Sequence, residues 1–491
     1  MQHFVLAIHM KRIFTTNLIF LLLLNAVIKP IWIFAIDRNV QITLGAQEYG
    51  LFFTLFNFTL FFNFLLDFGI TNFNNREISF HPNKISNQFF NIIIIKATLA
   101  LLYMIISIAA AIMVGFNNEQ IKLLILLSTN QILASFILFI RSNLNALHHF
   151  KADSILSVLD KLILIALISI YLWGDTNMQF NVYIFALCQT FSYMLALISS
   201  LWLLLKRYNI HININLSKTR IKQIVKEGFP FATLVLLMSL YGRLDTVFIE
   251  RLSDKGALSA GVYAQAFRLF DAFNMYPFLF ASLMLPVISR MLSEKIDISD
   301  MFRFNTIILI VPVIAVAVPT IIFDKPLMSI LYKEHIEISA EVLKLLMGSF
   351  FFVALSYLFG TALTANGNIW LLCRISLFTL VVNILLSIIL IPQIGVIGAG
   401  FVNLISNGIA AVLQWFFFTK TFRIKIDWVI TFKIVIFIIA TIIVSVIFFE
   451  KSNASILGYI GAILAILVLA FLSGLIKLKS MITLLKDSKG E

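Results

Sequence analysis

The hydrophobic pattern of this chain consists of long, nearly unbroken apolar runs that recur from one end to the other. A helix needs about 20 mostly apolar residues to cross the hydrocarbon core of a bilayer. Only a helix satisfies all its backbone amides within such a run. The pattern therefore predicts an all-α membrane protein of about 14 transmembrane helices. We expect them near residues 13–36, 49–70, 88–114, 121–140, 154–173, 180–205, 228–250, 259–286, 303–323, 342–365, 369–391, 395–419, 428–449 and 455–476.

The composition agrees with lipid as the medium in which the chain folds. The chain is 60% hydrophobic and 12% charged, whereas soluble domains carry roughly 25% charged residues. Its two cysteines, Cys188 and Cys373, lie inside apolar runs and are interpreted as small buried hydrophobic residues, not as a disulfide or a metal site. No phosphate-binding loop, HExxH or CxxC motif occurs in the sequence. We expect no cofactor, no metal and no covalent chemistry, which favours a transporter over an enzyme.

The net charge of +13 comes from basic residues in short segments between the apolar runs. If the N-terminus is cytoplasmic, the inner segments hold more than twice as many Lys and Arg residues as the outer ones. This asymmetry predicts a multi-pass protein of the inner (cytoplasmic) membrane with both termini in the cytoplasm. Nucleic acid is not expected as a partner, because the positive charge is explained by membrane topology.

The most basic of these segments divides the predicted spans into two halves of six. Two faint repeats support the division, "LGAQEYG" with "LSAGVYAQ" and "LNALHHF" with "LTANGNI". Because each half has an even number of spans, the halves would be parallel repeats. The predicted domains are an N-terminal lobe (1–205), a basic cytoplasmic linker (206–227), a C-terminal lobe (228–420), two additional helices (428–476) and a cytoplasmic tail (477–491).

Several segments, in order and spacing, resemble the polysaccharide biosynthesis and O-antigen flippase (Wzx-type) family of the MOP exporter superfamily. "LGAQEYGL", "LLDFGITN" and "NNRE" resemble the first pair of helices of that family. "FIRSNLNALHHFKADSILSVLDK" resembles its connection between the fourth and fifth helices. "GFPFATLVLLMSLYGRLDTVFI", "AGVYAQAFRLFDAF" and "LMLPVISRML" are similar to the start of its second lobe, and "ANGNIWLLCRISLFTLVVNILLSIILIPQIGVIGAG" to its eleventh and twelfth helices. A long loop with Asp37 and Arg38 follows the first predicted span.

The resemblance implies a fold and a function. The fold would be two six-helix lobes in a V-shaped, MATE-like arrangement plus two C-terminal helices. The function would be a flippase that moves a polyprenyl-diphosphate-linked oligosaccharide by alternating access from the cytoplasmic to the outer leaflet. Its cargo would be a repeat unit of O-antigen, capsule or exopolysaccharide. Membrane lipids are expected partners, and a polysaccharide polymerase and a chain-length regulator are candidate partners.

Charged residues inside predicted spans are the candidate functional residues, because a charge in a bilayer usually faces a bundle interior or a cavity. One group lies toward the cytoplasmic ends of the spans: Asp67, Lys96, Arg141, Asp160, Lys161 and Arg374. We interpret Lys96, Arg141, Lys161 and Arg374 as candidates for binding the diphosphate, since cations offset its lost hydration. The competing interpretation is that Arg141 and Lys161 extend to the membrane interface and serve topology.

The second group lies in the outer half of spans seven and eight: Arg243, Asp245, Arg268 and Asp271. Arg268 and Asp271 are three residues apart and share a helix face. These four residues, with Asp67, are candidates either for a structural salt-bridge set or for ion coupling, in which Asp245 or Asp271 would bind a proton or Na⁺.

Other functions stay open on the sequence alone. The same fold could carry lipid II or export drugs, although a cationic drug would favour an acidic cavity. A polymerase or ligase needs a large outer loop, and the predicted outer loops are short. A passive structural subunit would not explain charges inside the membrane.

Overall fold

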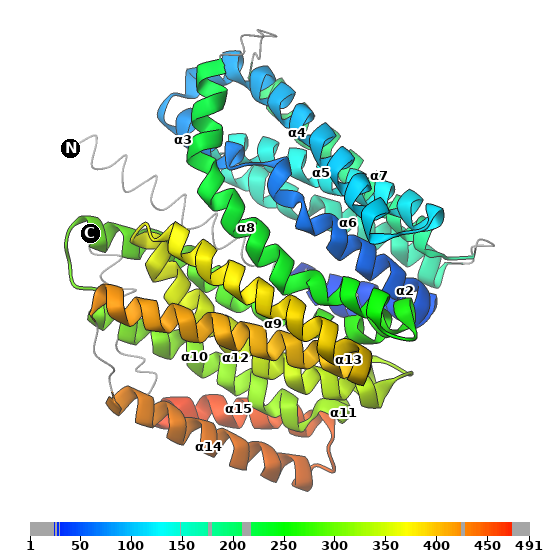
Figure 1. Ribbon diagram of the computed structural model, residues 1–491, viewed down its shortest axis with the longest axis vertical. Helices are drawn as coiled ribbons and strands as arrows, with labels where there is room; N and C mark the ends of the chain where they lie inside the picture. Colours follow the sequence, from blue (N-terminus) through cyan, green and yellow to red (C-terminus); the bar gives the residue numbers. More distant parts are fainter. Residues whose placement is uncertain are drawn as a thin grey trace. The chain divides into compact units, whose positions relative to one another are not determined.

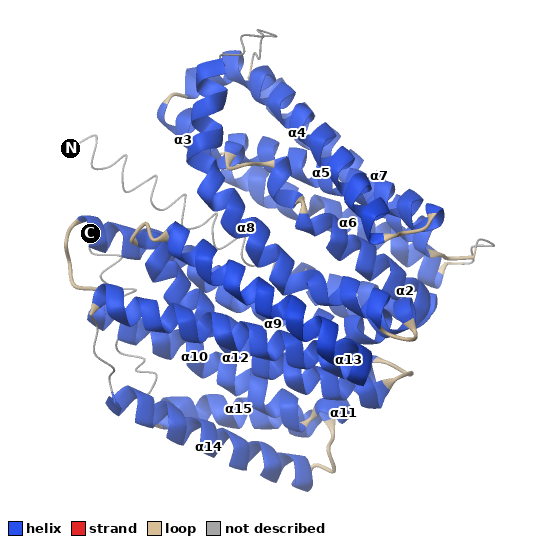
Figure 2. Cartoon of the chain, viewed as in Figure 1, coloured by secondary structure: helices blue, strands red, loops and turns tan. Residues whose placement is uncertain are grey.

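The computed structural model describes Leu24, Val27, Ile28 and residues 30–147, 149–174, 179–208, 218–423 and 428–473. Within these ranges every regular element is a helix and no strand occurs (Figure 2). This agrees with the predicted all-α fold class. The chain divides into two compact units, Met1–Glu250 and Arg251–Glu491, named here the N-terminal and the C-terminal unit. The lobe boundaries predicted from the sequence stay predictions.

The N-terminal unit is built from long helices joined by short turns (Figure 1). A π-helix, η1 (Ile31–Asp37), leads directly into α2, and a 3-10 turn, η2 (Asn63–Leu66), connects α2 to α3. A second 3-10 turn, η3 (Pro82–Lys84), precedes α4. The helices are α2 (Arg38–Phe61), α3 (Ile70–Phe80), α4 (Ile85–Val114), α5 (Asn118–Ala146), α6 (Phe150–Trp173), α7 (Val182–Arg207) and α8 (Lys218–Leu252).

The C-terminal unit is also helical, and its longest helix is bent. The helix α13 leaves the helical conformation at Ile394 and Gly395, shortly after Pro392. The two spans predicted at 369–391 and 395–419 are therefore the two arms of this one element. The helices are α9 (Gly256–Ser293), α10 (Ser299–Ile322), α11 (Asp324–Leu331), α12 (Ile336–Ala365), α13 (Ile369–Phe422), α14 (Trp428–Lys451) and α15 (Ile456–Leu472).

Ten helices in the described part of the chain are long and apolar enough to cross a membrane. The bent α13 counts once among them, and α15, with 17 residues, falls below the length required. From residue 88 onward, each predicted span coincides with a helix or with an arm of α13. The first predicted span lies largely outside the described residues. That 14 helices cross the membrane stays a prediction.

The start of the chain differs from the sequence-based prediction in one respect. The loop expected to carry Asp37 and Arg38 is helical, because η1 runs into α2 without interruption. Only Gly45 leaves the helical conformation, with φ of 73°, which glycine adopts without steric cost. Asp37 tolerates burial in a helix because it accepts hydrogen bonds from the Tyr49 hydroxyl at 3.0 Å and the Gln41 amide at 3.2 Å.

The second predicted span also ends earlier than expected. The helix α2 stops at Phe61, and the separate helix α3 occupies residues assigned to a loop. Between them, Gly69 has φ of 77°, and a Cβ added there would lie 3.7 Å from Gly228 Cα of α8. A Cβ at Gly228 would lie 2.2 Å from the Phe68 carbonyl oxygen. Two glycines therefore permit close backbone packing between α8 and this turn.

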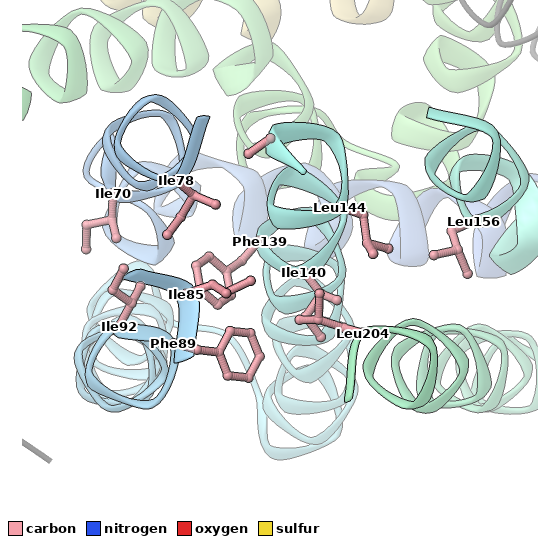
Figure 3. Packing of buried hydrophobic residues seen from close by; sticks show 11 residues of the cluster. Ile70, Ile78, Ile85, Phe89, Ile92, Phe139, Ile140, Leu144, Leu156 and Leu204 are labelled. Carbon is pink, nitrogen blue, oxygen red and sulfur yellow. The ribbon is translucent and has the colours of Figure 1, made fainter. Parts of the chain in front are cut away.

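The core of the N-terminal unit that matters for function lies where α3, α4 and α5 meet (Figure 3). The helix α5 contributes Phe139, Ile140 and Leu144, which are all buried. They pack with side chains from the neighbouring helices, namely Ile70, Ile78, Ile85, Phe89, Ile92, Leu156 and Leu204. This packing fixes the rotation of α5 about its axis, so the opposite face of α5 is also fixed.

Candidate functional site

A polar cavity of about 510 Å³ lies within the N-terminal unit. Its walls come from η2, the turn after it, α3, α5 and the first turn of α6. This volume is within the usual range of ligand pockets, roughly 300–1,000 Å³. The cavity is therefore large enough for a ligand and lies among helices of membrane-spanning length.

The helix α5 provides the longest wall of this cavity. Gln131, Ser135, Leu138, Ser142 and Asn145 all line it and follow one another at intervals of three or four residues, which places them on one face of a helix. The core residues Phe139, Ile140 and Leu144 of α5, which Figure 3 draws, pack against the neighbouring helices and do not line the cavity. The sequence of α5 thus separates an apolar packing face from a polar face turned to the cavity.

Lys96 of α4 is the most deeply buried cation near the cavity. Its side chain is 1% exposed, and its ammonium donates to Asp67 Oδ1 at 2.8 Å and to the Leu66 carbonyl at 2.9 Å. The ammonium also lies 5.9 Å from the centre of the Phe139 ring. Asp67, which is 34% exposed and lines the cavity, additionally accepts a hydrogen bond from the Thr71 hydroxyl. Lys96 therefore lies behind the cavity wall and is paired with Asp67, which lines the cavity.

Arg141 of α5 forms the second ion pair of the cavity. Its Nε donates to Asp153 Oδ1 of α6 at 2.8 Å. The Asn145 amide donates to the other carboxylate oxygen of Asp153 at 3.4 Å. Arg141, Asn145 and Asp153 all line the cavity. The guanidinium has five N–H donors, so a pair formed through Nε leaves donors for an anionic ligand.

The structure thus gathers three of the predicted residues, Asp67, Lys96 and Arg141, around one cavity and adds Asp153, which sequence reasoning missed. The four groups are two cations and two carboxylates, so their charges balance. Each buried cation is stabilised by its own carboxylate, because an unpaired charge among apolar helices is costly. An anion that enters this cavity can compete with Asp153 for Arg141, which lines the cavity with 19% of its side chain exposed.

Lys161 lies in the N-terminal unit but does not line this cavity. Its ammonium is 5.4 Å from the centre of the Trp32 ring and 5.5 Å from that of Tyr193. It also lies 3.5 Å from Asp160 Oδ2. Two aromatic faces and one carboxylate therefore surround Lys161, an arrangement that stabilises a cation through ring quadrupoles as well as charge.

The other candidate residues are distributed over both units. In the N-terminal unit, Arg243 donates to Asn57 Oδ1 at 2.7 Å and Asp245 is completely buried. In the C-terminal unit, Arg268 and Asp271 are partly buried on α9, and Arg374 is exposed on α13. A salt-bridge set or an ion-coupling site formed from Arg243, Asp245, Arg268 and Asp271 stays a prediction.

Sequence reasoning also missed the neutral polar residues of the cavity. Asn63, Asn75, Gln131 and Asn145 carry carboxamides into it, but a search for charges does not single them out. The regular spacing of polar residues on α5 was the signal available, since polar side chains on one face of an apolar helix usually meet a partner or a cavity. Asp153 lies one residue before the predicted fifth span and so falls among the predicted loops.

Comparison with known families decides the classification. The model of the polysaccharide biosynthesis protein family matches residues 15–292, which is more than half of the chain and includes every residue of the cavity. The chain belongs to this family. A second model, MatE, matches residues 230–389. With its many long apolar helices, the protein is a multi-pass membrane protein of the polysaccharide biosynthesis family.

A curated relative is the capsular polysaccharide biosynthesis protein CapF of Staphylococcus aureus. It is 23% identical over 223 residues, which are 45% of this chain and 56% of CapF. The match thus spans little more than half the length of that relative.

Solved structures with similar folds include an inward-facing multidrug resistance MATE family transporter of the MOP superfamily and the lipid II flippase MurJ in an inward closed conformation. The first has a TM-score of 0.65 at 16% identity and covers 80% of this chain and 94% of that chain. The second has a TM-score of 0.61 at 16% identity and covers 87% and 98%. The resemblance predicted from the sequence is confirmed, and the fold is that of MOP superfamily transporters.

Proposed function

We propose that this protein flips a polyprenyl-diphosphate-linked oligosaccharide, a repeat unit of O-antigen, capsule or exopolysaccharide, from the cytoplasmic to the outer leaflet of a bacterial inner membrane. The observation that carries the proposal is the polar cavity with two ion pairs, Lys96–Asp67 and Arg141–Asp153, within helices of membrane-spanning length. Membership of the polysaccharide biosynthesis family supports an intermediate of polysaccharide synthesis as the cargo. Both termini would lie in the cytoplasm.

The diphosphate is the part of the cargo that depends most on contacts with the protein. It loses hydration when it leaves the membrane surface, and charge-assisted hydrogen bonds from Arg141 would replace that hydration. Asp153 holds Arg141 in position before the cargo arrives and yields the guanidinium to the diphosphate. Asp67 performs the same task for Lys96, which is too deeply buried to remain unpaired. The prenyl tail stays in the lipid throughout, so no apolar surface of the cargo has to move into water.

Movement of the cargo follows from alternating access. The cavity would open first to the cytoplasmic side, take up the sugars and diphosphate, and then open to the outer side. Of the candidates for ion coupling, Asp67 is the one that lines this cavity. Its carboxylate is partly exposed and contacts Lys96. A polysaccharide polymerase and a chain-length regulator would then act on the product.

The test is flipping by the purified full-length protein in liposomes that contain undecaprenyl-diphosphate-linked oligosaccharide. An impermeant glycosidase reports the glycan that reaches the outer surface. Arg141→Gln is expected to slow flipping about tenfold or more, because a hydrogen bond to a charged group contributes roughly 1.5–3 kcal/mol. The matched control is Arg290→Gln, since Arg290 also pairs with a carboxylate, Glu294 at 2.9 Å, but is 81% exposed. Flipping by the control should match wild type.

A folding defect is separated from a binding defect by the double variant Arg141→Gln, Asp153→Asn. It removes both charges while keeping side chains that can hydrogen-bond to each other, so the protein should unfold at nearly the wild-type temperature. It should still fail to flip the cargo. Wild-type flipping by either cavity variant in folded protein would refute the assignment of Arg141.

A further inference from the structure

A second cluster of charged and aromatic side chains lies in the N-terminal unit, outside the polar cavity. It comprises Asp160 and Lys161 of α6, Trp32 of η1 and Tyr193 of α7, and is named here the α6 cluster. Lys161 lies midway along α6, a helix of 24 residues that is long enough to cross a membrane. A charge at that depth is costly and usually faces a cavity or the interior of a bundle. The α6 cluster is therefore a candidate binding site in its own right.

The two charged groups of this cluster are accessible and only loosely paired. The side chains of Lys161 and Asp160 are 28% and 17% exposed, and their ion pair measures 3.5 Å. The two ion pairs of the polar cavity measure 2.8 Å, which is a normal hydrogen-bond distance. An ammonium has three N–H donors, and a carboxylate accepts through both oxygens. Both groups therefore retain hydrogen-bonding capacity for a ligand.

Two aromatic rings flank this ion pair. The Lys161 ammonium lies 5.4 Å from the centre of the Trp32 ring and 5.5 Å from that of Tyr193, close to the limit of about 6 Å for a cation–π contact. Both aromatic residues are partly exposed. Trp32 stacks on Phe185, with ring centres 6.4 Å apart and planes inclined by 7°. It belongs to a π-helix, an element frequently found at functional sites.

This combination of groups suits a neutral, hydroxyl-rich ligand better than an anion. The face of an aromatic ring carries partial negative charge, and Asp160 carries a full negative charge, so both repel a diphosphate. A sugar ring presents C–H groups that can pack on an aromatic face. Its hydroxyls can donate to the Asp160 carboxylate and accept from the Lys161 ammonium.

The position of the α6 cluster relative to the polar cavity is a further observation. Lys161 follows Asp153 by eight residues on α6, which corresponds to roughly 12 Å along the helix axis. Asp153 pairs with Arg141, the proposed ligand of the diphosphate. This separation is longer than one sugar ring, so a sugar at Lys161 would not be the one attached to the diphosphate.

We infer that the α6 cluster binds a sugar of the glycan beyond the one attached to the diphosphate. This inference rests on the proposed function, because it takes Arg141 as the ligand of the diphosphate. It assigns a sugar to Lys161 in place of the diphosphate, for which the sequence made that residue a candidate. Recognition comes from ring stacking and from hydrogen bonds to hydroxyls, so the cluster favours long glycans over short ones.

The test measures binding of synthetic lipids to the purified full-length protein. The probes are undecaprenyl diphosphate without sugar and the same lipid carrying a mono-, di- or trisaccharide of N-acetylhexosamines. Wild type should bind the trisaccharide lipid about tenfold more tightly than the sugarless lipid. Trp32→Leu and Tyr193→Leu should each lose most of this gain and leave affinity for the sugarless lipid within about twofold of wild type.

Two matched variants separate loss of ring stacking from a structural defect. Trp202→Leu also removes a tryptophan beside a lysine, because Lys206 lies 4.8 Å from the Trp202 ring centre and the residue is 58% exposed. This control should keep the full gain from the glycan. Trp32→Phe retains an aromatic face on the same helix and should keep most of the gain.

The double variant Asp160→Asn, Lys161→Met decides between a sugar and a diphosphate as the ligand. It should weaken binding of the glycosylated lipids and leave the sugarless lipid unchanged. Equal weakening of all four lipids would assign the diphosphate to Lys161 and overturn the inference.

Other outcomes separate the inference from the proposed function. The inference alone fails if wild type binds all four lipids equally, or if folded Trp32→Leu and Tyr193→Leu proteins keep the full gain. Arg141→Gln should weaken binding of all four lipids by a similar factor. If wild type binds none of the lipids, the proposed function and the inference both fail.

Discussion

Each unit of the molecule contains a cavity of nearly the same volume, but the two cavities are lined by opposite chemistry. The cavity of the N-terminal unit, about 510 Å³, contains two ion pairs and several carboxamides. One cavity of the C-terminal unit, about 520 Å³, has an apolar lining: Phe352, Leu404, Ile405, Gly408, Ile409, Val412 and Leu413. Only the first can replace the hydration of a charged or hydroxyl-rich ligand. The second can accept hydrocarbon.

The units also differ in how they use buried polar groups. In the C-terminal unit, Ser349 of α12 donates to Asn403 Oδ1 of α13 at 2.7 Å, and Asn407 donates to Ser349 at 3.0 Å. These neutral side chains bind one another, which is how polar residues hold helices together in membranes. In the N-terminal unit, the polar groups retain donors and acceptors toward a cavity. The contrast teaches that buried polarity indicates a ligand where the polar side chains line a cavity, because unpartnered buried oxygens such as Gln414 Oε1 also occur in the C-terminal unit.

The largest expected effect comes from unpairing the buried lysine of the polar cavity. Asp67→Asn removes the carboxylate that holds Lys96, whose side chain is 1% exposed. Breaking a buried ion pair by removing one partner costs about 3–5 kcal/mol, and the partial exposure of Asp67 places the expected loss near the lower end. Thermal and denaturant unfolding in detergent would measure it.

The double variant Asp67→Asn, Lys96→Met tests the cause of that loss. It removes both charges and keeps an unbranched side chain in the lysine space, so most of the lost stability should return. Flipping should not return, because the cation is gone. If the double variant is as unstable as Asp67→Asn, the packing of the turn, and not the unpaired charge, explains the loss.

Much of this fold could be predicted from the sequence, because hydrophobic length alone selects helices in lipid. From residue 88 onward, the apolar runs coincide with helices of the structure. The exceptions lie near the start of the chain, where Asp37 and Arg38 suggested a loop. Asp37 is instead buried, and the hydrogen bond that it accepts from Tyr49, twelve residues away, leaves no local sequence signal.

The candidate site was predictable only in part, for a related reason. A search for charges within spans found Lys96, Arg141 and Asp67. A charge in lipid is costly, so such residues usually face a bundle interior or a cavity. It could not tell that Lys161 lies against Trp32 and Tyr193 and not in the cavity, since that depends on the rotation of each helix. Carboxamides such as Gln131 cost less to bury and therefore did not stand out.

An intermediate effect is expected where α8 packs on the turn before α3. Gly228→Ala would bring a Cβ to 2.2 Å from the Phe68 carbonyl oxygen, and overpacking of this kind costs about 1–3 kcal/mol. The same substitution at Gly408 in the apolar cavity meets Phe352 only at 3.7 Å and should be neutral or stabilising by up to about 1 kcal/mol. Unfolding midpoints of the two variants would compare the units directly. A Gly228→Ala variant as stable as Gly408→Ala would show that α8 moves to accommodate the methyl group.

The smallest effect is expected in the hydrogen-bonded cluster of the C-terminal unit, and it completes the comparison. Ser349→Ala removes one hydroxyl, but Asn407 still donates to the Asn403 carbonyl at 2.9 Å and to Asn403 Oδ1 at 3.1 Å. Because no donor is stranded, the cost should be about 0.6 kcal/mol, the average for such a bond in a membrane protein. Flipping should stay at the wild-type rate if the cluster only joins α12 to α13. Loss of flipping in stable Ser349→Ala protein would give this cluster a part in transport, and buried polarity in both units would then serve the cargo.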